Sequence, residues 1–215
     1  YTQLLEETRE IVSYCDQNDW SSIWFTEHHF NYEGMESCTN PLMMCTDAAA
    51  RTSKIRLGQA CNTITFHNPI RLAEDIATLD QMSKGRVEIG IGRGVYGREA
   101  VHFNKEADLK DQAKNFRLFS ESLEIMKKAW TEDFFSHKGE FYNYPSDKFV
   151  WQHDMSPPLD GVVDEKTNIL KKISVLPKPY QKPHPPISQV VDGERSIKWA
   201  GENGIKTIMW IPTVK

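Results

Sequence analysis

Two short stretches of the sequence carry residue types that could bind or transform a small molecule. The first is VEIGIGRGVYGREA, in which residues 92–97 read as G-x-G-x-x-G around Arg93. The second is Glu27-His28-His29, which follows an apolar run. A glycine-rich turn exposes backbone N–H groups to an anion, and an arginine can bind a phosphate through two parallel hydrogen bonds. Histidine is suited to proton transfer, because imidazole ordinarily titrates near neutral pH.

The glycine pattern alone does not identify a dinucleotide site. A Rossmann fingerprint needs a helix that starts at the third glycine, here Gly97, and a second strand that ends in Asp or Glu about twenty residues later. The sequence meets neither requirement, because the segment after Gly97 is polar and Asp111 falls at the start of a long helical pattern. Arg93 and Tyr96 are also bulky for a turn that a pyrophosphate approaches closely. Two interpretations remain open: a phosphate-binding turn at the end of a barrel strand, and a tight turn with a solvated Arg93.

Apolar periodicity indicates which elements must position these residues. Strand-like and helix-like segments alternate along the chain, as they do in a parallel sheet with right-handed crossover connections. Asn-Pro pairs at residues 40 and 68 are typical helix starts, and glycines at 85 and 204 are typical helix stops. We expect about five strands. The expected helices cover 3–17, 40–53, 68–85, 116–130 and 194–204, and the expected strands cover 21–30, 54–65, 86–92, 185–191 and 205–211.

The stretch from about residue 142 to residue 186 breaks this alternation. It is rich in Pro, Asp and Lys, with isolated aromatic residues at Phe149 and Trp151. Loops of this length inside a compact domain are usually functional or mobile. We expect a loop or small hairpin over one end of the sheet, within a single domain that covers residues 1–215.

The bulk composition narrows the possible partners. The chain has 215 residues, with 26 Lys and Arg against 30 Asp and Glu and a formal net charge of -4. This mild acidity does not favour nucleic acid or an anionic membrane, and no uninterrupted apolar run is long enough to span a bilayer. The four cysteines form no C-x-x-C motif. We therefore expect buried thiols in a reducing cytoplasm, rather than a disulfide framework or a metal site.

Several segments resemble the bacterial luciferase-like flavin monooxygenases, in the same order and over nearly the whole chain. They are EHHF (27–30), NPIRLAEDIATLDQMSKGR (68–86), GIGRG (90–94) and VVDGERSIKWAGENG (190–204). The most specific part is AEDIATLDQMSKGR followed by IGRG. The resemblance implies an α/β fold of the (β/α)8 TIM-barrel type, here incomplete, with about five to six parallel strands and a long inserted loop region.

The resemblance also implies a cofactor. Members of the family use reduced FMN and molecular oxygen to oxidise small organic substrates. Arg93 would hold the FMN phosphate, and the helix start after the neighbouring strand would add backbone N–H groups. Ser196 can donate its hydroxyl, whereas an ionised Asp192 cannot donate, so we expect Asp192 to act through its backbone or to orient the loop. The implied cofactor-binding residues of the two turns are Gly92, Arg93, Gly94, Val190, Asp192, Gly193 and Ser196.

The family places a histidine beside the reactive edge of the flavin, and His28 matches it. His29 is a second candidate, and Glu27 is expected near the cofactor. Side chains that follow one another in an extended strand point to opposite faces, so we expect only His28 to face the flavin unless the strand bends.

Three further positions follow from the resemblance. Ala60-Cys61 falls where luciferases carry a non-proline cis peptide bond beneath the flavin ring, a rare feature that gathers at functional sites. Asn62 is expected to reach the ring edge. Trp210, at a strand end, is expected either to stack near the flavin or to lie in the core.

The chain departs from the family in two respects. The luciferase alpha chain has a reactive cysteine where this chain has Gly92, so light emission is not expected. A complete barrel needs about 250 residues or more. The family's first strand would precede Tyr1, and about two further strands and helices would follow Lys215. We therefore expect a fragment of a longer protein.

The implied activity is a monooxygenase reaction. Oxygen would add to reduced FMN, and the resulting peroxyflavin would oxidise a small organic substrate, with His28 managing the proton. A separate flavin reductase would supply the cofactor, and the full-length protein would form a homodimer or heterodimer. One alternative is hydride transfer with a flavin or a deazaflavin. Alternatives from other classes are a metal-dependent barrel hydrolase with zinc on the histidines and a non-catalytic flavin-binding subunit like the luciferase beta chain.

Overall fold

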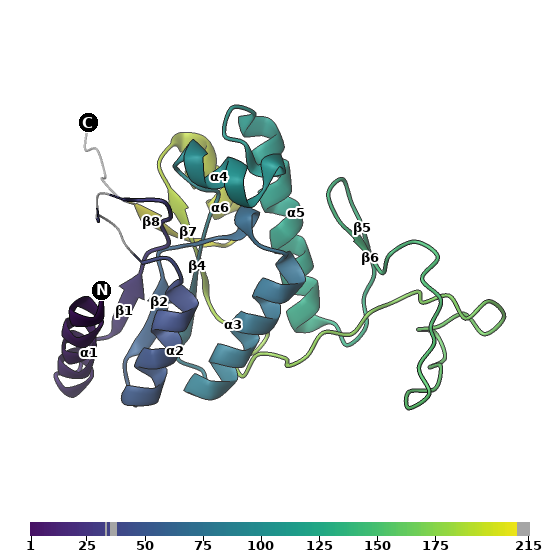
Figure 1. The fold of residues 1–215 in the computed structure, drawn as a ribbon, viewed down its shortest axis with the longest axis horizontal. Coiled ribbons are helices and arrows are strands. Elements are labelled where there is room, and N and C mark those ends of the chain that lie inside the picture. The colour runs from purple at the N-terminus through teal and green to yellow at the C-terminus, as the bar shows by residue number, and fades with distance from the viewer. Residues whose placement is uncertain (33, 35–37, 210–215) are drawn as a thin grey trace.

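The computed structural model describes residues 1–32, 34 and 38–209 of the chain. Within these ranges the strands form a curled parallel sheet in the order β1-β2-β4-β7-β8, and β3 also pairs with β4 (Figure 1). This is half of an α/β barrel, which confirms the fold class expected from the alternating segments. The parallel strands are β1 (Ser22–Phe25), β2 (Arg56–Gln59), β3 (Asn62–Thr63), β4 (Val87–Gly92), β7 (Ile187–Val191) and β8 (Lys206–Met209).

Three helices begin at side chains that cap them. Asn40 accepts a hydrogen bond from Met43 N at 2.9 Å, Asn68 accepts one from Ile70 N at 3.0 Å, and Asp111 caps its helix in the same way. These caps satisfy N–H groups that have no partner inside the helix. The starts expected at residues 40 and 68 are confirmed. The helices are α1 (Thr2–Gln17), α2 (Pro41–Arg51), η1 (Ile64–Phe66), α3 (Pro69–Ser83), α4 (Gly97–Phe103), η2 (Lys105–Ala107), α5 (Gln112–Thr131) and α6 (Glu194–Glu202).

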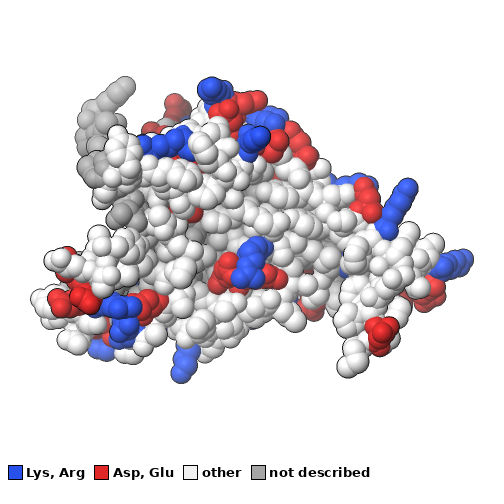
Figure 2. Space-filling model, viewed as in Figure 1, with Lys and Arg blue, Asp and Glu red and all other residues white. Residues whose placement is uncertain are grey.

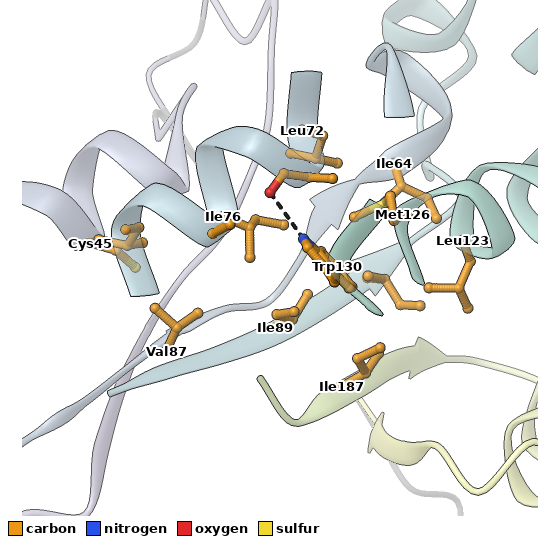
Figure 3. Packing of buried hydrophobic residues seen from close by; sticks show 14 of the residues in the cluster. Cys45, Ile64, Leu72, Ile76, Val87, Ile89, Leu123, Met126, Trp130 and Ile187 are labelled. Carbon is orange, nitrogen blue, oxygen red and sulfur yellow. Dashed lines mark hydrogen bonds between the residues drawn. The ribbon is translucent and has the colours of Figure 1, made fainter. Parts of the chain in front are cut away.

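The main core lies between the sheet and helices α2, α3 and α5. Alternate residues of β4 point to this side, and Val87, Ile89 and Ile91 are fully buried. Figure 3 shows Val87 and Ile89 in one apolar layer with Trp130 of α5, whose indole N–H donates to the Ala73 carbonyl at 3.0 Å. Each large side chain buried in this way contributes about 1.5–3 kcal/mol of transfer free energy. This layer therefore holds β4 firmly at the centre of the sheet.

Between β2 and β3 the chain bulges along one edge of β4, because β2 pairs with residues 87 and 88 of that strand and β3 pairs with residues 91 and 92. A Cβ atom at Gly90 would overlap the Gln59 carbonyl, so only glycine leaves room for the bulge. The peptide bond between Ala60 and Cys61 is cis, at the position expected from the family resemblance. The single strand expected over residues 54–65 is therefore two short strands separated by this bulge.

The helix after the glycine-rich turn corrects one expectation. α4 begins at Gly97, the third glycine of the G-x-G-x-x-G pattern, although no helix was expected there. Its seven residues are too few for clear apolar periodicity, which explains the miss. The second requirement of a dinucleotide site is still not met, because η2 and α5 follow α4 and no acidic strand end lies among these described residues.

The expected excursion has a different position from the one predicted. β5 (His137–Lys138) and β6 (Asn143–Tyr144) form an antiparallel hairpin against α5, whose Glu121 carboxylate accepts hydrogen bonds from backbone N–H groups at residues 140–142. The chain that carries Phe149 and Trp151 extends beyond this hairpin, away from the sheet (Figure 1). The hairpin and the chain beyond it therefore do not cover an end of the sheet, whereas the returning part of the segment reaches the start of β4, where Gln181 Nε2 donates to the Val87 carbonyl at 2.9 Å.

The surface and the cysteines add three facts. On the face drawn in Figure 2, positive and negative side chains are intermixed and neither sign forms a continuous area. Among the described residues, no helix combines the length and the apolar character that crossing a bilayer requires. All four cysteines are free thiols, and Cys15 and Cys45 show the burial expected for them, whereas Cys38 and Cys61 are partly exposed.

Candidate active site

The first candidate region is the loop that follows β1. The strand ends at Phe25, so residues 27–29 lie in a loop and not in the extended strand that was expected. The Glu27 carboxylate is only 5% exposed. Its Oε1 lies 2.9 Å from His67 Nε2 and 3.2 Å from His29 Nε2, and its Oε2 accepts a hydrogen bond from Thr63 N at 2.6 Å. One buried carboxylate thus holds three separate segments together.

These contacts explain the electrostatics of Glu27. Burial by itself would raise the pKa of this carboxyl, but hydrogen bonds from His29, His67 and the Thr63 amide outweigh it and lower the pKa to about 2. Glu27 is therefore ionised at neutral pH. Its oxygens are committed to protein partners, so the described contacts give it a structural role, and its expected contact with a cofactor stays a prediction.

The two histidines have different surroundings. His29 lies against the ring of Phe103, with centroids 4.4 Å apart, while its Nε2 faces Glu27. His28 packs against Tyr96, with centroids 5.5 Å apart, and its backbone N–H donates to the Cys38 carbonyl at 2.9 Å. The two side chains lie in different surroundings because the chain turns here, and not because side chains alternate along an extended strand. The catalytic role expected for each histidine stays a prediction.

A second buried carboxylate, that of Glu99, approaches the same loop from α4. Glu99 is 1% exposed. Its Oε1 accepts a hydrogen bond from His29 N at 2.6 Å and lies 3.6 Å from His28 Nδ1. Glu99 was not expected from the sequence, because nothing in the local pattern links residue 99 to residue 28.

The cis peptide segment lies next to the glycine-rich strand end. A Cβ atom at Gly92 would overlap the Cys61 sulfur. Desolvation, reinforced by the negative charge of Glu27, raises the pKa of the Cys61 thiol to about 12. The amide of Asn62 is buried and donates to Gln59 Oε1 at 3.0 Å. Its expected contact with a flavin ring edge stays a prediction.

The second candidate region centres on Arg93, just after β4. Its guanidinium donates to the side-chain oxygens of Gln112 at 3.2 Å and Asn115 at 3.3 Å, and lies 5.7 Å from the centre of the Phe116 ring. The Arg195 guanidinium lies over the same ring at 4.6 Å. Two cations from different elements therefore meet at one aromatic ring. Arg195 was not identified from the sequence, although it falls inside the segment that carries the family resemblance.

Apart from the more distant charge of Asp192, no carboxylate among the described residues offsets the charge of the arginine pair. Among the described residues, no carboxylate lies within ion-pair distance of Arg93 or Arg195. Burial lowers the pKa of Arg93, the charge of Asp192 opposes this shift, and the charge of Arg195 adds to it. The pair is thus a fixed concentration of positive charge at the carboxyl ends of β4 and β7.

The start of α6 lies in the same region. Gly193 is the N-cap residue, and the Ser196 hydroxyl donates to the Gly193 carbonyl at 2.8 Å. This hydroxyl is therefore already used within the protein, whereas the expectation was a bond to phosphate. Asp192 is exposed, and Val190 is partly buried in β7. Gly94 adopts φ +91° and packs against Phe66.

Trp210 lies outside the described residues. Among the residues that the structure describes, no group of three or more His, Cys, Asp or Glu side chains is arranged to hold a metal ion.

Solved structures share this fold. The oxygenating constituent of 3,6-diketocamphane monooxygenase from Pseudomonas putida, in complex with FMN, superposes with a TM-score of 0.73 at 22% identity, covering 97% of this chain and 52% of that one. An F420-dependent secondary alcohol dehydrogenase gives 0.72 at 19% identity, covering 95% and 54%. At these identities the similarity establishes the fold alone.

Sequence relatives narrow the assignment. The oxygenase component of a flavin-dependent trigonelline monooxygenase from Acinetobacter baylyi is 29% identical over 203 residues, which are 94% of this chain and 47% of the relative. The chain spans about half the length of the curated relatives it matches. The model of the luciferase-like monooxygenase family matches residues 1–214. The chain therefore belongs to the luciferase-like monooxygenase family.

Proposed function

We propose that this chain carries the FMN-binding and proton-transfer residues of a monooxygenase that uses reduced FMN and oxygen to oxidise a small organic molecule. The observation that carries the proposal is the arginine pair at the carboxyl ends of β4 and β7. Arg93 and Arg195 share the Phe116 ring, and no described carboxylate neutralises either of them. Active sites of barrel enzymes gather at this end of the strands.

The residues present fit a phosphate monoester. Two guanidinium groups supply planar N–H donors for a doubly charged anion. The first backbone N–H groups of α6 lie beside Arg195, and a helix N-terminus favours negative charge. Ser196 would act by holding the Gly193 turn, since its hydroxyl bonds to the Gly193 carbonyl. Asp192, whose negative charge acts on Arg93, would orient the loop that leads into α6.

The other residues would act on the ring end of the cofactor. Bound reduced flavin supplies the electrons that activate oxygen, which is chemistry no side chain provides. The Ala60-Cys61 backbone, on the bulge beside Gly90, would help to hold the flavin ring. His28 would accept or return the proton during oxygen transfer. Glu27 would fix this end of the site, because it joins the loop after β1 to the segment after the cis peptide bond.

A separate reductase is part of the proposal. One relative is named as an oxygenase component, which describes an enzyme that receives its reduced flavin from another protein. The chain has no dinucleotide fingerprint of its own, since the glycine-rich turn leads into α4 and α5 without an acidic strand end. Reduced FMN would therefore arrive by diffusion or by transfer from a partner.

Flavin affinity tests the phosphate assignment. FMN and riboflavin differ only in the phosphate, so their dissociation constants are measured side by side by fluorescence quenching. Arg93→Ala should weaken FMN binding by about 30- to 100-fold and leave riboflavin binding unchanged. His28→Ala should bind FMN like the wild type. Lys198→Ala, an exposed cation on the same helix as Arg195, is the matched control. Equal FMN affinity in wild type and Arg93→Ala would contradict the assignment.

Oxygen consumption tests the reaction class. Wild-type protein is loaded with reduced FMN without oxygen and then mixed with oxygen and a panel of aldehydes, ketones and aromatic acids. Substrate-dependent oxygen uptake with incorporation of labelled oxygen into the product supports a monooxygenase. Oxygen-independent reduction of a deazaflavin by an alcohol would instead support the hydride-transfer alternative, which the F420-dependent structural neighbour brings into consideration.

A further inference from the structure

We propose that Asn115 is a positioning residue for Arg93. Its buried carboxamide binds both the backbone and the guanidinium of Arg93, and this leaves the Nε–Nη2 edge of the guanidinium for an anion. The use of that edge for the phosphate of FMN rests on the proposed function. The restraint on the arginine side chain does not, and it can be tested without flavin.

The two residues are joined by a pair of hydrogen bonds. Asn115 lies near the start of α5 and is 0% exposed. Its Oδ1 accepts a hydrogen bond from Arg93 Nη1 at 3.3 Å, and its Nδ2 donates to the Arg93 carbonyl at 3.2 Å. One amide therefore holds two ends of one residue. Both bonds can form together in only a few rotamers of the long side chain, so the amide restricts where the guanidinium can lie.

The chemistry of the partners allows the Asn115 amide only one orientation. Its Nδ2 also donates to the Ala107 carbonyl at 2.9 Å. Carbonyl oxygens can only accept hydrogen bonds, and a guanidinium can only donate them. A flipped amide would set its oxygen against two carbonyl oxygens and its N–H groups against the cation, which is unfavourable for a buried group. The oxygen of Asn115 therefore faces the guanidinium.

The hydrogen bonds with α5 engage one nitrogen of the guanidinium. Nη1 donates to Gln112 Oε1 at 3.2 Å as well as to Asn115 Oδ1. Within the described part of the chain, the hydrogen bonds of this guanidinium all use Nη1, so Nε and Nη2 keep their donors for a ligand. These two nitrogens form one edge of the planar fork, and such an edge binds a carboxylate or a phosphate through two parallel bonds. Arg9 uses the same edge toward Asp47.

The next residue of α5 places the guanidinium beside a second cation. The Arg93 guanidinium carbon lies 5.7 Å from the centre of the Phe116 ring, and the Arg195 guanidinium lies over the same ring at 4.6 Å. Like charges repel, so Arg93 needs contacts that hold it there before an anion binds. A neutral amide holds the cation without cancelling its charge, which an aspartate would do. The ordering of the side chain is then complete before the ligand arrives.

Nitrogen NMR of the flavin-free protein tests the restraint. The protein is labelled with ¹⁵N-arginine, and Arg93→Lys identifies the Arg93 signals. The hydrogen bonds of Nη1 should slow rotation of the guanidinium. The Nη1 and Nη2 protons of Arg93 should therefore give separate signals at a temperature where the exposed Arg195 gives one averaged signal. Averaged Arg93 signals in wild type would overturn the proposal by themselves, whether or not any variant folds.

Variants of Asn115 separate the restraint from the charge. Asn115→Ala removes the buried acceptor, so rotation of the Arg93 guanidinium should become about tenfold faster. Asn115→Asp keeps an acceptor of the same size and should keep the rotation slow. Gln112→Ala removes the exposed acceptor, and is the matched comparison with a smaller expected effect. Unchanged rotation in folded Asn115→Ala would contradict the proposal.

Flavin affinity tests the use of the restraint. Asn115→Ala should weaken FMN binding by about 3- to 10-fold, because the arginine must then be ordered by the ligand, and should leave riboflavin binding unchanged. Asn115→Asp should also weaken FMN binding, since its carboxylate competes with the phosphate for Arg93. In an Arg93→Ala background, Asn115→Ala should cause no further loss, because it acts through the arginine. A purely structural residue would instead weaken the binding of both flavins and add to the loss caused by Arg93→Ala.

The two kinds of measurement separate this proposal from the proposed function. Slow rotation in wild type that is lost in Asn115→Ala, together with a failure of the protein to bind FMN, would reject the proposed function and keep the restraint. Wild-type FMN affinity in an Asn115→Ala variant whose Arg93 rotates freely would reject the use of the restraint in FMN binding.

Discussion

The loop after β1 and the arginine pair differ in whether the protein supplies partners for their charges. In the loop, Glu27 is fully buried and its oxygens bind two histidines and an amide, so the negative charge is balanced inside the protein. In the arginine pair, Arg93 and Arg195 contact neutral amides and one aromatic ring. Charge of one sign is balanced in the first region and left unbalanced in the second.

This difference separates residues that hold the loop together from residues that we propose to bind a ligand. A buried carboxylate with its hydrogen bonds completed costs several kcal/mol to disturb, because its removal leaves other polar groups without partners. A partly exposed cation without an anionic partner stabilises the empty protein little and gains most when an anion arrives. Stability measurements should therefore respond to the loop, and ligand affinity should respond to the arginine pair.

The largest effect is expected from the loop. Glu27→Ala removes the acceptor shared by His29, His67 and the Thr63 amide, and should lower the free energy of unfolding by about 3–5 kcal/mol. Urea denaturation followed by circular dichroism measures this change. Arg195→Ala is the matched comparison, with an expected change within about 0.5 kcal/mol. If Glu27→Ala lowered the free energy of unfolding by less than about 1 kcal/mol, the proposed difference between the loop and the arginine pair would be contradicted.

The second effect is the acid dependence of the same loop. The pKa of Glu27 is about 2 in the folded protein, against an ordinary value of 4.5. Because the folded-state value is the lower one, the stabilisation is complete above about pH 4.5 and is lost as the pH falls toward 2. The loss is about 3 kcal/mol from this group. Glu27→Gln should lack this part of the acid dependence, so the stabilities of the two proteins should converge at low pH.

Glycine substitutions compare the packing of the two regions. Gly92→Ala places a methyl group against the Cys61 sulfur, and should cost about 1–3 kcal/mol. Gly193→Ala meets no atom within 4 Å and should be nearly neutral. Cys61→Ala in the Gly92→Ala background should restore most of the loss, since it removes the sulfur. Unfolding curves of the wild type, Gly92→Ala, Cys61→Ala and the double variant check this. If the two single losses simply added up in the double variant, the contact between the two side chains would be contradicted.

The smallest expected effect is the change in FMN affinity when Arg195 is removed. Arg195 is exposed, so its contribution to anion binding is weaker than that of Arg93. Arg195→Ala should reduce FMN affinity by about tenfold, which corresponds to about 1.4 kcal/mol, and leave riboflavin affinity unchanged. Titration at rising salt concentration should reduce this difference, because exposed charges are screened. Equal loss of FMN and riboflavin affinity would point to a structural effect.

Much of the fold was predictable because its signals are local. Asn40-Pro41 and Asn68-Pro69 predict helix starts, because the asparagine side chain can cap the helix and the proline lacks an N–H group that would have no partner there. The apolar run 87–91 predicts a buried strand. The α4 helix was missed because seven residues show no clear period, and the position of the hairpin was missed because Glu121 acts at a distance of about twenty residues in sequence.

The family resemblance supplied the cis bond at Ala60-Cys61, which the structure contains, and it also supplied Arg93 and His28, whose roles stay predictions. The resemblance did not reveal what partners these residues have. That His29 faces Glu27 while His28 faces Glu99 depends on how the loop turns after Phe25, which alternation along a strand cannot show. Arg195 was missed for the same reason, since its meeting with Arg93 requires β4 and β7 to be neighbours.

The stretch from Arg93 to Glu99 has a consequence of its own. Its first residue is one of the two cations, and its last residue lies beside His28. The spacing between an anion bound at one end and the imidazole at the other is therefore set by six peptide units that run through the Gly94 turn and the first turn of α4. One residue inserted within this stretch would leave both binding groups intact and still place them at the wrong separation for a single ligand.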